Sequence, residues 1–144
     1  MAENLTPSLL ELGGSDPLIV TDDANLTRAA KATVFGRFSN NGQICEAVKR
    51  VYVNEKVADT FIANVKKEVE AITSGEYTTP SNDVGPLANA RGVDTLREQL
   101  QDALDKGAKL IAGGFPKSND TLFWPATVLI NVDHSMRVMQ EEVF

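Results

Sequence analysis

The sequence predicts an α/β fold built on a largely parallel sheet. Short apolar and β-branched segments at 17–20, 51–53, 109–112 and 127–130 alternate with longer segments whose apolar residues recur every three or four positions, the spacing of amphipathic helices. Strands that alternate with helices of this length form βαβ units, and their sheet must be covered by helices on both faces. No internal repeat, low-complexity tract or shift in composition indicates a second domain.

Composition and charge narrow the class of protein. The 144 residues are 42% hydrophobic and 24% charged, values typical of a globular domain large enough to bury a core. The 14 basic and 20 acidic residues give a net charge of −6, which argues against a nucleic-acid surface. No signal-peptide pattern and no apolar run of transmembrane length is visible. With a single cysteine, the expected location is the reducing cytoplasm, without a membrane partner.

The first third of the chain is predicted to form two strands and a helix. Residues 8–12 are a short apolar run that glycines stop, and residues 17–20 form a second run. A helix follows over 26–37, and residues 22–25 offer a choice of N-cap. Glu11 lies within the first run. It either faces a cavity, where a carboxylate suits general-base chemistry near neutral pH, or occupies an exposed position on an edge strand.

The two later helices, the loop between them and the next strand are predicted from the same kinds of pattern. A helix from residue 57 to 72 and a second one over 93–104 are amphipathic, and the second should stop at Gly107. Residues 73–86 are rich in Ser, Thr, Gly, Pro and Asn and must form a loop. The strand at 109–112 ends at a Gly-Gly pair, which we interpret as a turn because no G-x-G-x-x-G pattern follows.

Cys45 is the only cysteine, so its value lies in packing or in reactivity. Residues 40–43 are turn formers, and residues 46–48 are able to begin a helical turn. That arrangement would put Cys45 near a helix N-terminus, where free N–H groups and the helix dipole lower the pKa of a thiol. The alternative is a small buried hydrophobe behind an Asn-Gly turn.

A family resemblance favours the reactive cysteine. Residues 38–50 resemble the nucleophile motif of the aldehyde dehydrogenase superfamily, an aromatic-x-Asn-x-Gly-Gln-x-Cys pattern. Residues 10–14, Leu-Glu-Leu-Gly-Gly, look like the general-base motif of that family, and 141–144, Glu-Glu-Val-Phe, match its cofactor-contact segment. The resemblance covers 9–144. It implies that 1–144 are part of a Rossmann-like, three-layer catalytic domain, with the dinucleotide-binding domain and the C-terminal part absent from this chain.

The resemblance also implies the chemistry. Cys45 would attack an aldehyde carbonyl and form a thioester, with its own backbone N–H holding the oxyanion, and Glu11 would activate the water that hydrolyses this thioester. The hydride acceptor in the full-length parent would be NAD or NADP. Glu142 would accept hydrogen bonds from the nicotinamide-ribose hydroxyls, and Phe144 would border the nicotinamide. The implied partners are a small aldehyde and further copies of the subunit in a homo-oligomer, and this fragment alone is expected to be inactive.

The implied substrate is succinate semialdehyde, because residues 10–17 and 47–50 look most like those of bacterial succinate-semialdehyde dehydrogenases. His134, the only histidine, is expected at the surface, so no metal site is predicted. Two other functions remain open. The chain is alternatively a non-catalytic truncated copy that acts as an interaction module, or a cysteine hydrolase in which Glu11 serves as the base for Cys45.

Overall fold

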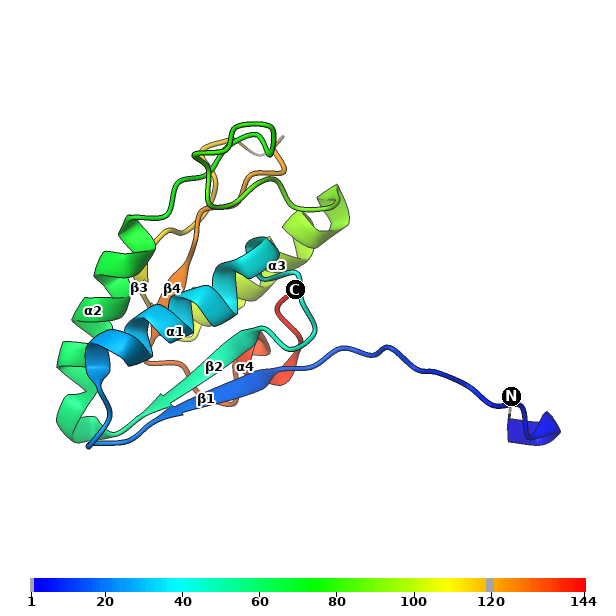
Figure 1. Ribbon diagram of the computed structural model, residues 1–144, viewed down its shortest axis with the longest axis horizontal. Helices are drawn as coiled ribbons and strands as arrows, with labels where there is room; N and C mark the ends of the chain where they lie inside the picture. The colour runs from blue at the N-terminus through cyan, green and yellow to red at the C-terminus, as the bar shows by residue number, and fades with distance from the viewer. Residues whose placement is uncertain (1, 119–120) are drawn as a thin grey trace.

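The computed structural model describes residues 2–118 and 121–144. An α/β domain carries an N-terminal segment, blue in Figure 1, that projects away from it before the first strand. The elements in chain order are η1 (Ala2–Asn4), β1 (Asp16–Val20), α1 (Leu26–Phe38), η2 (Ser39–Gly42), β2 (Val48–Val53), η3 (Glu55–Val57), α2 (Ala58–Glu70), α3 (Ala90–Asp105), β3 (Lys109–Ala112), β4 (Val128–Ile130) and α4 (Arg137–Gln140).

The first half of the fold is a βαβ unit, as predicted. β1 and β2 pair in parallel, with Leu18 opposite Val51 and Val20 opposite Val53. α1 forms the crossover between them, because parallel neighbours need a long connection. It begins where the Asn25 side chain accepts a hydrogen bond from the backbone N–H of Arg28 at 3.0 Å.

The second half differs from the predicted parallel arrangement. β3 and β4 are antiparallel, with Lys109 opposite Ile130. The described residues between the two strands hold no helix, and a connection without a crossover helix brings the chain back in the opposite direction. Before β3, α3 ends as predicted at Gly107, whose φ of +97° is a left-handed conformation that favours glycine.

Two apolar clusters hold the elements together. α1 packs against α2, and the first cluster joins both helices to β1 and β3 through Val20, Ala30, Phe61, Val65, Val69 and Ala112. The second cluster joins the end of α3 to the segment around α4 through Ala103, Ala108 and Met136. Both long amphipathic helices therefore bury the faces that their periodicity predicts. Of the helices described, none is long and apolar enough to cross a membrane.

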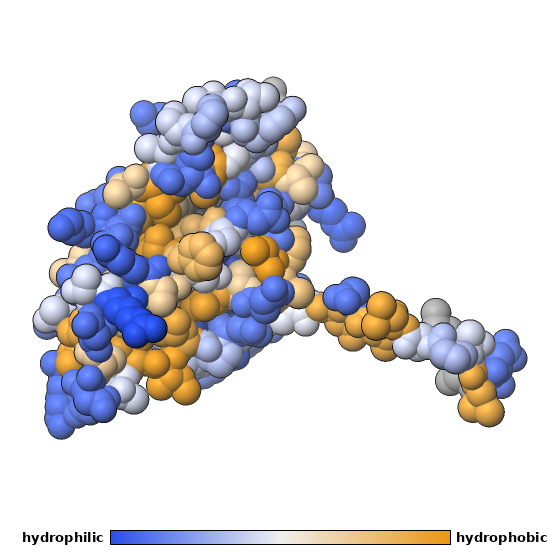
Figure 2. Space-filling view, in the orientation of Figure 1, coloured by the Kyte–Doolittle hydropathy of each residue, from blue (hydrophilic) through white to orange (hydrophobic). Residues whose placement is uncertain are grey.

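The predicted strand at 8–12 is wrong. This stretch is extended but pairs with no described strand, and Leu9 and Leu12 are 90% and 73% exposed. Figure 2 shows the apolar side chains of the projecting segment in orange, uncovered by the domain. A strand needs a neighbour to satisfy its backbone, and an apolar run alone does not supply one.

The strand at 51–53 is present within β2, but the prediction that it is buried is wrong. Val51 and Tyr52 are each 38% exposed. β2 has one partner strand in the part of the chain that the structure describes, so its other edge is uncovered. The short α4 was not predicted, because a helix of four residues has no periodicity to detect.

Two phenylalanines test the placement of the core. Phe61 is 4% exposed, whereas Phe35 is 78% exposed. Phe61→Ala should lower the free energy of unfolding by about 3–5 kcal/mol, because it removes a buried ring and leaves a cavity. Phe35→Ala should change it by less than about 0.5 kcal/mol. Urea unfolding followed by circular dichroism measures both, and equal midpoints for the two variants would contradict this core.

Candidate active site

The turn before Cys45 uses backbone conformations that few residues adopt. Asn40, Asn41 and Gly42 have φ values of 51°, 60° and 74°, all in the left-handed region. Asparagine tolerates this region better than other residues with a Cβ. A Cβ at Gly42 would also lie 2.7 Å from the carbonyl oxygen of Arg37. The Asn-Asn-Gly sequence therefore allows α1 to end in this tight turn, which leads to the cysteine.

The same turn is fixed to the loop that precedes α3. The side-chain amide of Asn41 donates hydrogen bonds to the carbonyls of Gly85 and Pro86 at 2.7 and 2.8 Å, and its oxygen accepts one from the N–H of Gly85 at 3.1 Å. The Gln43 side chain accepts a hydrogen bond from the N–H of Ala88 at 2.9 Å. Two polar residues of the nucleophile motif thus have a structural role that the sequence did not reveal.

Cys45 lies in the connection between η2 and β2, just before the strand begins. It does not lie at a helix N-terminus, so that prediction is wrong. The N–H of Ala47 donates to the carbonyl of Ile44 at 3.1 Å, which closes a turn, and the chain enters β2 directly afterwards. The pairing of β2 with β1 starts so soon after Cys45 that no helical turn has room to form.

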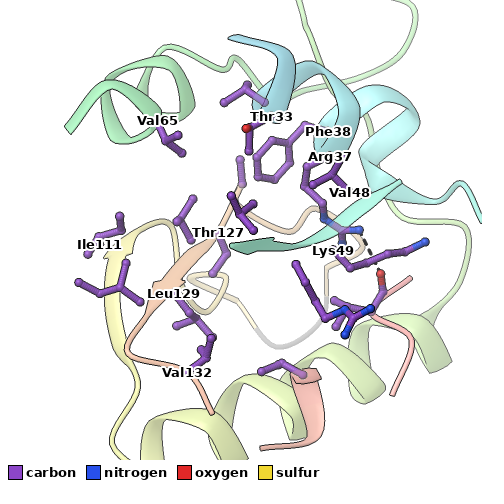
Figure 3. Close-up of a pocket in the computed structure, with 18 of the residues that line it drawn as sticks. Thr33, Arg37, Phe38, Val48, Lys49, Val65, Ile111, Thr127, Leu129 and Val132 are labelled. Atoms are coloured by element: carbon purple, nitrogen blue, oxygen red, sulfur yellow. Dashed lines mark hydrogen bonds between the residues drawn. The ribbon is translucent and has the colours of Figure 1, made fainter. Parts of the chain in front are cut away.

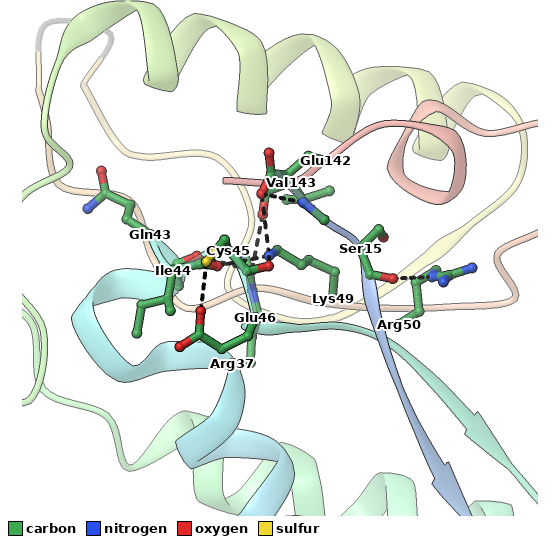
Figure 4. Close-up of polar contacts among 12 residues, drawn as sticks. Ser15, Arg37, Gln43, Ile44, Cys45, Glu46, Lys49, Arg50, Glu142 and Val143 are labelled. Atoms are coloured by element: carbon green, nitrogen blue, oxygen red, sulfur yellow. Dashed lines mark hydrogen bonds and ion pairs between the residues drawn. The ribbon is translucent and has the colours of Figure 1, made fainter. Parts of the chain in front are cut away.

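The carboxylate of Glu46, the next residue, shifts the pKa of the Cys45 thiol. Cys45 Sγ donates a hydrogen bond to Glu46 Oε2 at 2.8 Å (Figure 4). This bond to a carboxylate stabilises the protonated thiol and raises the pKa of Cys45, opposite to the direction predicted from a helix N-terminus. The same bond lowers the pKa of the Glu46 carboxyl.

Lys49 fixes the backbone of the turn from Ile44 to Ala47, which is called the cysteine turn. Its side chain is fully buried, and its amine donates to the carbonyls of Ile44 and Cys45 at 2.8 and 2.6 Å. The amine also lies 3.5 Å from Glu142 Oε1. A buried ammonium needs such partners, because burying a charge without them is very costly. Lys49 therefore connects the cysteine turn to the C-terminal acidic segment.

Glu142 connects the cysteine turn and Lys49 to the segment before β1. Its Oε1 accepts a hydrogen bond from the N–H of Gly14 at 3.1 Å, and a Cβ at Gly13 would overlap its carboxylate. A Cβ at Gly14 would lie 3.2 Å from the carbonyl oxygen of Cys45. Gly13 and Gly14 are therefore needed so that this segment can lie close to Glu142 and to the carbonyl of Cys45. Parts of all three family motifs meet here, although they are far apart in the sequence.

Glu11 and Phe144, the other two predicted site residues, contribute no side chain to these contacts. Glu11 is exposed on the projecting segment, and its carboxylate has no hydrogen bond or ion pair with the residues that the structure describes. Phe144 is 49% exposed. The structure thus brings Cys45 and Glu142 together through Lys49, and it does not bring Glu11 into contact with Cys45.

Two further polar residues position the C-terminal segment. Arg37 donates from Nη1 to the carbonyl of Val143 at 3.1 Å, and burial lowers the pKa of this guanidinium. Gln99, 1% exposed on α3, donates to Glu141 Oε2 and to the carbonyl of Glu142, both at 3.1 Å. One weak signal for the role of Gln99 is present in the sequence, since Gln99 is a polar residue beside the apolar positions of an amphipathic helix.

No three of the described His, Cys, Asp and Glu residues are grouped so that they could hold a metal ion. His134 is exposed, as predicted, and its carbonyl accepts a hydrogen bond from Gln140 at 2.6 Å.

Two curated relatives are similar over almost the whole chain. The succinate-semialdehyde dehydrogenase [NADP(+)] of Mycobacterium avium is 42% identical over 142 residues, which are 99% of this chain and 30% of that protein. The vanillin dehydrogenase of Pseudomonas fluorescens is 41% identical over 143 residues, 99% of this chain and 29% of that protein. The chain therefore spans about 30% of the length of these relatives.

Solved structures and a family model agree with these relatives. The succinate-semialdehyde dehydrogenase of Burkholderia pseudomallei superposes with a TM-score of 0.94 at 36% identity, and the match covers 99% of this chain and 30% of that one. An oxidoreductase from Marinobacter aquaeolei gives a TM-score of 0.94 at 44% identity, with the same coverage. The model of the aldehyde dehydrogenase family matches residues 1–144, so the chain belongs to the aldehyde dehydrogenase family.

Proposed function

We propose that this chain is part of the catalytic domain of an NAD- or NADP-dependent aldehyde dehydrogenase that oxidises succinate semialdehyde to the acid through a thioester on Cys45. The main supporting observation is the convergence of the cysteine turn, Gly14 and Glu142 around the buried amine of Lys49. The substrate is supported by the Mycobacterium avium relative, whose name gives succinate semialdehyde and NADP. The expected setting is a cytoplasmic homo-oligomer.

In the proposed reaction, Cys45 Sγ forms a bond to the aldehyde carbon, and the thiol proton leaves to an acceptor. Glu46 already accepts a hydrogen bond from this thiol, so it is the nearest acceptor. The adduct then loses a hydride, which the nicotinamide accepts when it is bound, and a thioester remains. Water adds to the thioester, the C–S bond breaks, and the acid leaves while the thiol is restored.

Glu142 and Phe144 fit the proposed contacts with the nicotinamide end of the cofactor. Glu142 uses Oε1 for Gly14 and Lys49, whereas its Oε2 has no hydrogen bond to the described residues. Its side chain is 30% exposed. A second oxygen that is partly exposed and unpaired suits acceptance from ribose hydroxyls. The half-exposed ring of Phe144 suits a contact with a planar base.

Glu11 is proposed as the base for thioester hydrolysis. Gly14 packs against the carbonyl of Cys45, and Glu11 lies three residues before it. Three residues of chain span at most about 10 Å, so the carboxylate has only a short path to the thioester. A rearrangement of the exposed segment would bring Glu11 close enough to accept a proton from the attacking water.

The reactivity of Cys45 gives a direct test of its pairing with Glu46. Because the carboxylate raises the pKa of Cys45, the thiol should react with iodoacetamide more slowly at pH 7 than a model thiol does. Glu46→Gln removes the charge, so the thiolate should form at lower pH and the rate at pH 7 should rise several-fold. Mass spectrometry across a pH series measures this. Glu55→Gln, an exposed carboxylate elsewhere, is the control, and an equal rise there would argue against the pair.

The catalytic roles are tested in a full-length enzyme that contains this sequence. Cys45→Ser should abolish reduction of NAD or NADP by succinate semialdehyde. Glu11→Gln should preserve one rapid burst of reduced nicotinamide and slow the steady state, because the carboxamide cannot accept a proton from water. Stopped-flow absorbance at the nicotinamide band separates the phases. Loss of the burst in Glu11→Gln would mean that this residue acts before the thioester forms.

The 144 residues on their own should neither bind NAD or NADP tightly nor oxidise aldehydes. The sequence offers an acid and an aromatic for the nicotinamide end but no Gly-rich turn before a helix for the pyrophosphate. Isothermal titration of the folded chain with each dinucleotide measures this. A micromolar affinity for either dinucleotide would show that the missing anchor is not needed.

A further inference from the structure

The pair Asn41–Gly42 is the only Asn-Gly sequence in the chain. Asparagine is a thermolabile residue, because the backbone nitrogen of the next residue can attack its side-chain amide carbon. Glycine exposes that nitrogen more than any other residue does, since it has no side chain. The sequence therefore makes Asn41 the asparagine of this chain that is most prone to lose its amide.

The turn after α1 needs both of these residues. Asn41 and Gly42 have φ values of 60° and 74°, in the left-handed region. Among residues with a Cβ, asparagine tolerates this region well, and a Cβ at Gly42 would lie 2.7 Å from the carbonyl oxygen of Arg37. The two residues that make this backbone conformation possible therefore also form the chemically labile pair.

The folded backbone and the contacts of the Asn41 side chain both block this reaction. Ring closure needs Cβ of Asn41 and the nitrogen of Gly42 on the same side of the Cα–C bond, whereas a ψ of 20° at Asn41 turns this nitrogen away. The side-chain amide also makes three hydrogen bonds, to the carbonyls of Gly85 and Pro86 and from the N–H of Gly85. All three must break before the amide carbon meets the nitrogen of Gly42.

The turn is able to open without the unfolding of α1. Phe38, the last residue of α1, packs against the first apolar cluster. With Arg37, it lines an apolar cavity of about 530 Å³ between β2 and β4 (Figure 3). The turn is held to the loop before α3 by the bonds of Asn41 and by one from the N–H of Ala88 to the Gln43 side chain, at 2.9 Å. A short segment held in this way opens at a lower free energy than the whole domain does.

We propose that Asn41 is a deamidation site, which the loop at 85–88 protects until the turn opens. In the open turn, the nitrogen of Gly42 forms a bond to Asn41 Cγ, and its proton leaves with the side-chain nitrogen as ammonia. Water then opens the resulting succinimide at either carbonyl and leaves aspartate or isoaspartate at this position. Water is the only co-reactant, and nothing is oxidised or reduced. This inference goes beyond the proposed function and does not depend on the roles of Cys45 or Glu11.

The product cannot restore the lost contacts. A carboxylate has no N–H to donate, so the carbonyls of Gly85 and Pro86 lose their partner and face a negative charge. Isoaspartate also lengthens the backbone of the turn. Because this turn leads to Cys45, deamidation releases the chain before the cysteine from the loop before α3.

Ageing of a full-length enzyme that contains this sequence tests the proposal. Peptide mass spectrometry follows the small mass gain that accompanies replacement of the amide nitrogen by oxygen. In urea, Asn41 should convert before the other asparagines of these 144 residues. In the folded enzyme at the same pH and temperature, its conversion should be about tenfold slower or more, because it waits for the turn to open.

Two glutamine variants form a matched pair. Gln43→Ala removes the bond to Ala88, so the turn should open more often, and Asn41 should convert about threefold faster or more in the folded enzyme. Gln101→Ala makes the same change at an exposed position of α3 and should alter the rate by less than about twofold. In urea the two variants should convert at equal rates, since no turn is then present. Circular dichroism checks that both fold, and the comparison of folded with unfolded wild type decides the question if Gln43→Ala does not.

The variant Asn41→Asp tests the effect of the product. The amides of residues 85–88 should exchange hydrogen faster in this variant than in the wild type, because the loop has lost its anchor. Asn4→Asp, the same charge change at an exposed residue, should leave their exchange unchanged.

Four results would overturn the proposal. They are equal conversion in folded and unfolded wild type, earlier conversion of another asparagine in urea, equal rates for the two folded glutamine variants, and unchanged exchange in Asn41→Asp. None of them is a measurement of aldehyde oxidation, so failure here is distinguishable from failure of the catalytic proposal.

Discussion

The buried amine of Lys49 is the interaction on which the candidate site depends. Its side chain has no exposed surface, and it bonds the carbonyls of Ile44 and Cys45 while pairing with Glu142. A charge in such a place is stable only if its partners stay in position, so the cysteine turn and the C-terminal segment constrain each other. The partners that this ammonium group needs therefore help to bring the motifs together, beside the contacts that Gly14, Arg37 and Gln99 make with the C-terminal segment.

Beside that amine, the charge that acts on the thiol is the carboxylate of Glu46. Glu46 raises the pKa of Cys45 through a hydrogen bond, whereas Lys49 is committed to backbone carbonyls and to Glu142. The hydrogen bond to Glu46 therefore favours the protonated form of the thiol over the thiolate. This arrangement gives stability to the resting thiol, since the thiolate is the form that alkylating and oxidising reagents attack.

Much of the fold was predictable because it is encoded locally. The apolar spacing identified α1, α2 and α3, and the β-branched runs identified β1, β3 and β4, since these patterns reflect burial on one face or in a sheet. The run at 8–12 failed because a strand needs a partner that local sequence does not reveal. The contact from Arg37 to Val143 joins residues 106 positions apart, and no local sequence pattern near either residue predicts it.

The family motif singled out Cys45 as a candidate nucleophile, but local propensity predicted the wrong environment for it. A helical turn at 46–48 is plausible from the residues alone, yet β1 pairs with β2 from Val48 onward and draws the chain into a strand. The position of the thiol is thus set by the sheet. Because β2 follows directly on the turn that carries Cys45, the pairing of Val48 with Asp16 on β1 also restrains that turn and the carbonyls that Lys49 holds. In this fold, the order of β2 and the order of the turn around Cys45 are therefore linked.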